Sequence, residues 1–160
     1  MNQSGLAVPK ERQVVTVHLG GGVKREGAVF LESARGGMTL HQKLVAFLDD
    51  EAAFFPLTLD DGSGTEFLQK KNVRMIELEY AADRERIEQA ISIMFTVHVT
   101  AVFPDDTSLT GLLIEDVPPE KARLSDCLNL PHAFLCVRTA GTLWYVNKAL
   151  LRRVEYAAIL

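Results

Sequence analysis

The sequence has few of the features that place a chain in a specialised class of protein. It contains only two cysteines, Cys127 and Cys136, and they lack the C-x-x-C spacing of a metal or redox site. Both lie in the second half of the chain, and no partner set occurs elsewhere. We therefore expect a reducing compartment in which each thiol acts as a small apolar side chain. No apolar run approaches the roughly 18 residues of a membrane-spanning helix.

A strong excess of charge is also absent. The formal net charge at pH 7 is −4, from 17 Lys and Arg against 21 Asp and Glu. The chain therefore lacks the broad positive field that drives non-specific nucleic-acid binding. Residues 1–11 are polar, contain Pro9 and have no apolar core of the kind found in a signal peptide. These features favour a cytoplasmic location without membrane association.

Patterns typical of catalysis are absent as well. Ser125 and Asp126 do not belong to a nucleophile elbow, and we interpret them as caps of a helical turn. The run Gly20–Gly22 precedes a second β-like segment instead of the helix that follows a phosphate loop, so we interpret it as a hairpin turn. Without convergent polar groups for acid–base or nucleophilic chemistry, we expect no enzymatic activity, no cofactor and no resident metal.

An internal repeat is the most informative pattern that is present. The string Thr-Val-His occurs at residues 16–18 and again at 96–98, and each copy opens a β-like run. Further segments match in the same order: 26–32 with 110–115, 53–55 with 133–135, and 67–70 with 145–148. This order indicates a duplicated unit. At about 65 residues, each unit is near the lower size limit for independent folding, so we expect the two to pack together.

Each unit is predicted to contain five short strands, with one helical turn between the second and the third. The predicted strands are 14–19, 26–32, 53–59, 66–70 and 73–80, then 95–102, 109–115, 132–139, 143–146 and 150–156; the predicted helices are 40–48 and 124–128. Gly27 falls where a sharply curved sheet needs a residue without a side chain. Asp83 is the expected N-cap of the linker helix. The resulting divisions are a flexible tail (1–12), a first unit (13–80), a helical linker (81–94) and a second unit (95–160).

Short strands at regular spacing are typical of small barrels, which avoid exposed edges by closing on themselves. We therefore predict an all-β protein of two tandem SH3-like five-stranded barrels joined by the short helical linker. The pattern resembles the Sm-like superfamily, and residues 123–129 (RLSDCLN), the strand at Phe134 and the pair Asn147-Lys148 are similar to an uncharacterised bacterial Sm-like family. The resemblance implies small barrels with ring-like or edge-to-edge association. The Asp-x-x-Met-Asn turn and the Arg-Gly step of RNA-binding members are missing, so no uridine pocket is implied.

Basic residues near the last strands of the two units are the candidate contacts for nucleic acid or a protein partner. They are Lys70, Lys71 and Arg74 in the first unit and Lys148, Arg152 and Arg153 in the second. Clusters of Lys and Arg are what phosphate contacts require. Glutamates close by in the sequence favour the alternative of a salt-bridged surface.

Two pairs of residues that contain histidine are candidate metal ligands. His18 and His98 occupy matching places in the Thr-Val-His strings, and two such imidazoles across a pseudo-twofold axis would form a metal or pH-sensitive site. No further ligand is near either one in the sequence, so we favour ordinary strand positions. His132 and Cys136 would share one face of a strand, and we favour packing there too.

The sequence thus favours a non-enzymatic interaction or scaffold module that binds a protein partner, or a second copy of itself, through exposed barrel edges. Strand addition uses backbone hydrogen bonds and leaves little signature in the side chains. RNA binding through the basic terminal strands is the alternative. Ligand binding in a deep cleft between the two units is a third interpretation.

Overall fold

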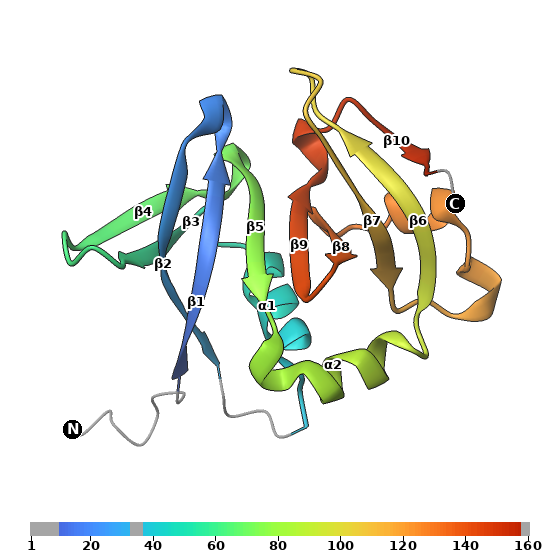
Figure 1. Cartoon of the computed structure of the whole chain (residues 1–160), viewed down its shortest axis with the longest axis horizontal. Helices are drawn as coiled ribbons and strands as arrows, with labels where there is room; N and C mark the ends of the chain where they lie inside the picture. The colour runs from blue at the N-terminus through green and yellow to red at the C-terminus, as the bar shows by residue number, and fades with distance from the viewer. Residues whose placement is uncertain (1–9, 33–36, 158–160) are drawn as a thin grey trace.

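The computed structural model describes residues 10–32 and 37–157, and its main feature is one antiparallel sheet of ten strands (Figure 1). The first half contributes β1 (Lys10–Leu19), β2 (Lys24–Glu32), β3 (Phe54–Leu59), β4 (Thr65–Gln69) and β5 (Val73–Glu79). The second half contributes β6 (Phe95–Val102), β7 (Ser108–Glu115), β8 (Phe134–Thr139), β9 (Thr142–Asn147) and β10 (Arg153–Tyr156). The order across the sheet is β10-β6-β7-β8-β9-β5-β1-β2-β3-β4. The all-β class is therefore confirmed.

Three short helices connect the strands. α1 (Leu40–Asp49) follows β2, α2 (Arg84–Ile91) joins the two halves, and α3 (Leu124–Leu128) follows β7. α1 begins with a capping box, in which the Thr39 hydroxyl accepts from the Gln42 N–H and the Gln42 side chain accepts from the Thr39 N–H. The predicted helices at 40–48 and 124–128 are confirmed. Each half thus has the order strand, strand, helix, strand, strand, strand.

The predicted tail ends earlier than expected. β1 begins at Lys10, which lies opposite Glu32 of β2, so residues 10–12 belong to the sheet. Residues 1–9 lie outside the described part of the chain. β1 is consequently the longest strand of the sheet, and its first residues extend the hairpin with β2.

The helix caps also differ from the prediction. Asp83 precedes α2, but its side chain makes no cap bond there; its carboxylate accepts from the backbone N–H of Leu40, at 3.1 Å. The negative charge therefore stabilises the start of α1, where free N–H groups attract anions. No side chain caps the start of α3, and the Asp126 carboxylate instead accepts from Nε of Arg123 at 2.9 Å.

The ladder registers show how the halves correspond, and they correct the alignment of the Thr-Val-His strings. The residue of β6 that occupies the place of His18 is Val102, because the two strings are out of register by four residues. His18 and His98 are therefore not equivalent. The pairs that set this register are Val15 with Gly27 and Val99 with Gly111.

A glycine in the second strand of each half lets the third strand come very close. A Cβ atom at Gly27 would lie 2.4 Å from the carbonyl oxygen of Thr58, and one at Gly111 would lie 2.6 Å from that of Arg138. Carbon and oxygen atoms that are not bonded do not approach to such distances, so any side chain would force the strands apart. The expectation that Gly27 must lack a side chain is confirmed, and the same geometry recurs in the second half.

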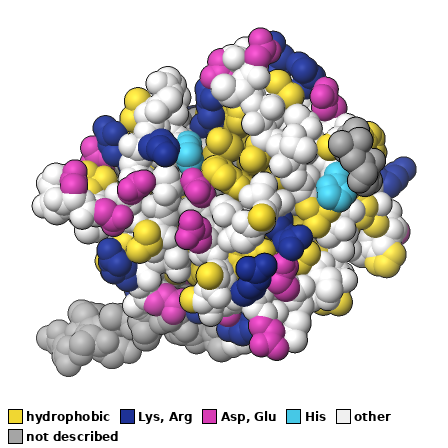
Figure 2. Space-filling model, viewed as in Figure 1, with side chains coloured by type: hydrophobic (Ala, Val, Ile, Leu, Met, Phe, Trp, Pro, Cys, Tyr) yellow, Lys and Arg dark blue, Asp and Glu magenta, His cyan; other side chains and the backbone are white. Residues whose placement is uncertain are grey.

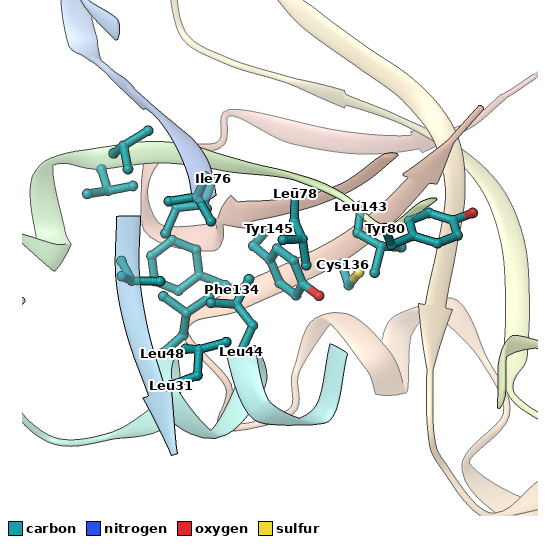
Figure 3. Packing of buried hydrophobic residues seen from close by; sticks show 14 of the residues in the cluster. Leu31, Leu44, Leu48, Ile76, Leu78, Tyr80, Phe134, Cys136, Leu143 and Tyr145 are labelled. Carbon is teal, nitrogen blue, oxygen red and sulfur yellow. The ribbon is translucent and has the colours of Figure 1, made fainter. Parts of the chain in front are cut away.

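The hydrophobic core is continuous across the two halves. One cluster of buried side chains combines the interior of the first half with Ile114, Phe134, Cys136, Leu143 and Tyr145 of the second (Figure 3). The other cluster is built from buried residues of the second half, among them Val99, Leu113, Leu135, Val137 and Val146. Strands β7–β9 therefore bury both of their faces. The halves pack together as expected from their size.

Helix α1 of the first half contacts the second half through His41. Nδ1 of His41 lies 2.7 Å from the hydroxyl oxygen of Tyr145, the two rings stack, and Sγ of Cys136 lies 3.9 Å from the same nitrogen. Burial lowers the pKa of His41 to about 4, against the opposing effect of the Asp116 carboxylate. The imidazole is therefore neutral at pH 7, and burial also raises the pKa of the Cys136 thiol well above its usual range.

The two close glycines lead to a test with an internal control. Gly27→Ala and Gly111→Ala should each lower the free energy of unfolding by about 1–3 kcal/mol, because the new methyl group displaces a backbone carbonyl in a packed sheet. Gly20→Ala should leave it nearly unchanged, since no atom lies within 4 Å of a Cβ there. Urea unfolding midpoints measure all three. Equal midpoints for the three variants would show that the close approach of the third strand to Gly27 and Gly111 does not affect the free energy of unfolding.

The neutral His41 predicts a pH dependence of stability. Its pKa is depressed in the folded chain, so between about pH 6.5 and 4 the unfolded chain binds a proton that the folded chain does not. The free energy of unfolding should therefore fall as the pH drops through this window, by about 3 kcal/mol. Urea unfolding at a series of pH values measures the slope.

Two variants isolate this contribution from the carboxylates that titrate in the same range. His41→Gln should be less stable at pH 7 but should show a shallower pH dependence, because it cannot take up a proton. His98→Gln removes an exposed imidazole and should keep the slope of the parent chain. A slope in His41→Gln as steep as the parent's would contradict the assignment.

Candidate interaction surfaces

Two of the predicted basic residues hold helix ends in matched positions. Nζ of Lys70 donates to two carbonyl oxygens at the end of α1, with that of Asp50 at 2.6 Å. Nζ of Lys148 donates to two carbonyl oxygens at the end of α3, that of its last residue, Leu128, at 3.2 Å and that of Leu130 at 2.6 Å. In each half, a lysine after the fourth strand thus satisfies the free carbonyls at a helix C-terminus. Desolvation lowers the pKa of both ammonium groups.

Two of the arginines predicted as contact residues form ion pairs with the turn between β6 and β7. Arg74 forms an ion pair with Asp105 at 3.0 Å, and its guanidinium carbon lies 4.6 Å from the centre of the Phe103 ring. Arg152, the residue before β10, contacts the same turn and donates to the Asp106 carboxylate at 3.2 Å. Arg74 belongs to the first half, so its contacts fasten the two halves together.

The last two candidates lie on the surface. Arg153 is exposed, and its Nε lies 3.0 Å from a carboxylate oxygen of Glu155. Lys71 is exposed, and its side chain forms no ion pair within the described residues. Figure 2 shows basic and acidic side chains next to one another across both halves. Five of the six residues thus make contacts inside the chain, and nucleic-acid contact by the group stays a prediction.

The structure does not bring the histidine pairs together as ligands. Nε2 of His18 lies 2.9 Å from a carboxylate oxygen of Glu77, whereas His98 is exposed on β6. His132 precedes β8, and its Nδ1 lies 2.7 Å from a carboxylate oxygen of Asp49 at the end of α1. Within residues 10–32 and 37–157, no group of three or more His, Cys, Asp or Glu side chains is placed to hold a metal.

The junction between the halves is an antiparallel ladder of β9 with β5. It runs from Val146 opposite Met75 to Thr142 opposite Glu79. At its end, the buried Asn147 donates through Nδ2 to three backbone carbonyls of the first half, those of Lys70, Lys71 and Val73. The fourth strand of one half thus pairs with the fifth strand of the other.

The two edge strands of the sheet are a fourth strand and a fifth strand, the same pair of positions that meet at the junction. Its edges are β4, the fourth strand of the first half, and β10, the fifth strand of the second. Within the described chain, β4 pairs only with β3 and β10 only with β6. Each edge carries an exposed aromatic ring, Phe67 on β4 and Tyr156 on β10. Such strands present free backbone N–H and C=O groups to a further strand.

Pairing with β3 determines which backbone groups of β4 point outward. The N–H of Lys70 donates to the carbonyl oxygen of Ala53, which makes this a hydrogen-bonded pair. Such pairs alternate with non-hydrogen-bonded ones along an antiparallel ladder. Phe67 lies opposite Pro56, three positions along, so the N–H of Phe67 points away from β3. Pro56 lacks an N–H and loses no bond to β4 at this position.

The outer face of β2–β4 exposes apolar side chains whose counterparts in the second half are buried. Phe30, Phe54 and Phe67 are 41%, 52% and 69% exposed, whereas the residues at the same ladder positions, Ile114, Phe134 and Tyr145, are 2%, 8% and 1% exposed. α1 and β5 of the first half cover the second set. No described element covers the first set. An exposed aromatic group of this kind is typical of a surface for protein contacts.

Two further observations complete the description of the surfaces. Among the helices of the described chain, none is long and apolar enough to cross a membrane. No family model, curated protein or solved structure matches the chain.

Proposed function

We propose that this chain is a non-enzymatic cytoplasmic interaction module that binds a strand of a protein partner, or of a second copy of itself, at β4 and β10. The observation that carries the proposal is the β9–β5 ladder, in which the same two kinds of strand already pair within the chain. Strand addition takes its affinity from backbone hydrogen bonds and its specificity from alternate side chains. It needs no catalytic or metal-binding group.

In this proposal each half is a small Sm-like barrel and the chain is a duplicated pair. The repeated order of strands and helix supports this interpretation. So do two pairs of residues with matching contacts: Gly27 and Gly111 at the close approach of a third strand, and Lys70 and Lys148 at a helix end. A duplication accounts for contacts that occur twice in one chain.

A second copy fits the geometry of both edges. If β4 of one copy paired with β10 of the next as β9 pairs with β5, Phe67 would lie opposite Val154, just as Tyr145 lies opposite Ile76. Tyr156 would then come within reach of the Phe67 ring. Because the two edges differ, the contact is head-to-tail and leads to closed rings or open chains instead of twofold dimers.

Proline substitutions on the two edges test the proposal. Phe67→Pro removes the outward N–H of β4 without breaking a bond to β3, so it should abolish association. Phe67→Ala keeps the N–H and should only weaken association. Val154→Pro should act like Phe67→Pro from the other edge. An equimolar mixture of the two proline variants should stop at a dimer, since one intact edge of each kind remains. Light-scattering mass over a range of concentrations measures these states.

A peptide of residues 151–157, which contains β10, tests the β4 edge directly if the parent chain is monomeric. Fluorescence anisotropy should show binding to the parent chain and to Phe67→Ala, but not to Phe67→Pro. Equal binding to all three, or to none, contradicts strand addition at β4. The ultraviolet spectrum of the purified protein tests the RNA-binding alternative. Absorbance from co-purifying nucleic acid that disappears at high salt would support it.

A further inference from the structure

A cavity of about 370 Å³ lies in the first half, between α1 and strands β2 and β3. Its apolar lining includes Phe30, Phe47, Phe54, Phe55 and Pro56. The rings of Phe47 and Phe55 contact each other edge to face, with centroids 5.5 Å apart. We call this site the first-half groove. Its position on the sheet face separates it from the backbone edge of β4.

The corresponding site in the second half is almost full. The cavity there measures only about 30 Å³. Ile114, Phe134 and Cys136 line it, and they occupy the ladder positions of Phe30, Phe54 and Pro56. The rest of the lining is Glu115, His132 and Tyr145 of the second half and four residues of α1, namely His41, Val45, Leu48 and Asp49. The helix of the first half therefore fills the groove of the second.

The contacts of α1 show what such a groove accepts. His41 and Val45, one helical turn apart, enter the second-half site, where His41 meets the Tyr145 hydroxyl at 2.7 Å. Leu48 follows one turn later and lies beside Phe134 in the shared core (Figure 3). Asp49 closes the contact with its bond to His132 at 2.7 Å. An apolar stripe with an acidic residue at its end is thus the ligand that the chain itself supplies.

A second copy joined head-to-tail does not supply an equivalent helix. Between the second and third strands of the second half, α3 has five residues against ten in α1. The exposed residues at this position are polar, Ser125 within α3 and Asn129 just after it. Short polar side chains would leave the apolar lining of the first-half groove uncovered. The length and polarity of α3 therefore favour an occupant from a different protein.

We infer that the first-half groove is the docking site for an amphipathic helix of a partner protein, which presents apolar side chains at positions i and i+4 as α1 does to the second half. Laying the apolar face of a helix into a hydrophobic groove is an established mode of recognition. The lining also carries Lys10, Lys43 and Lys70 beside Glu32 and Asp50, and Lys43 is already paired with Glu11 at 2.7 Å, so the apolar side chains are what the groove offers a partner. This inference goes beyond strand addition, because it uses the sheet face and not the edge of β4.

A bridged peptide based on α1 is the probe that tests the groove. It has the sequence of residues 39–50 with three substitutions. Leu40→Glu and Leu44→Lys are joined by a lactam bridge, and Phe47 is changed to Gln. These changes replace side chains that face the first half of the chain. The bridge also holds the helix and lowers the ordering cost of binding. Fluorescence anisotropy with the full chain should show saturable binding. A peptide that also carries Val45→Asp should bind at least about tenfold more weakly.

Chain variants identify the site of binding. Phe30→Asp and Phe54→Asp place a charge in the groove lining and should each weaken binding at least about tenfold, with unfolding midpoints near that of the parent chain because both rings are exposed. Ile93→Asp, which places the same charge on an exposed apolar residue outside the groove, should bind the probe like the parent chain. The peptide of residues 151–157 should not compete. Absence of binding, equal binding to Phe54→Asp, or competition by the strand peptide would each overturn the assignment.

Discussion

The packing of α1 and β5 against the outer face of β7–β9 is the interaction on which the rest of the structure depends. It buries Ile114, Phe134 and Tyr145, and it forms one continuous core from two halves that are each small for independent folding. The β9–β5 ladder and the Asn147 bonds fix the register of this contact. The neutral His41 is a consequence of the same packing, because a charged imidazole would lose its hydration inside the junction.

In a chain of two similar units, this contact can cover the outer face of only one unit. When each unit covers one face of its neighbour, the last unit in the series keeps an uncovered face and the two ends keep unpaired strands. Here the uncovered face carries Phe30 and Phe54, and the unpaired strands are β4 and β10. The surfaces proposed for binding are therefore those that remain exposed after the two halves have packed together. Their apolar character follows from the repeat itself.

The strands and helices were largely predictable, because short β-branched runs, turns and capping residues act locally. The correspondence of the halves was harder to read, since Thr-Val-His recurs four residues out of register while Gly27 and Gly111 match. The basic residues were recognised as a group, but a sequence does not show that Lys70 and Lys148 reach helix ends. The groove was missed, although one signal existed: Phe54 and Phe55 are adjacent on a strand and cannot both face the same core.

The two free edges are short, with five residues in β4 and four in β10, and charged side chains such as Glu66, Arg153 and Glu155 lie along them. Short charged edges resist unspecific pairing, because few backbone bonds form and a mismatched strand meets like charges. A partner that used the edge alone would consequently gain little affinity. The aromatic face beside β4 supplies the apolar burial that so short a ladder lacks. Edge and face together favour a partner that brings both a strand and a helix, which is the combination that β5 and α1 already bring to the second half.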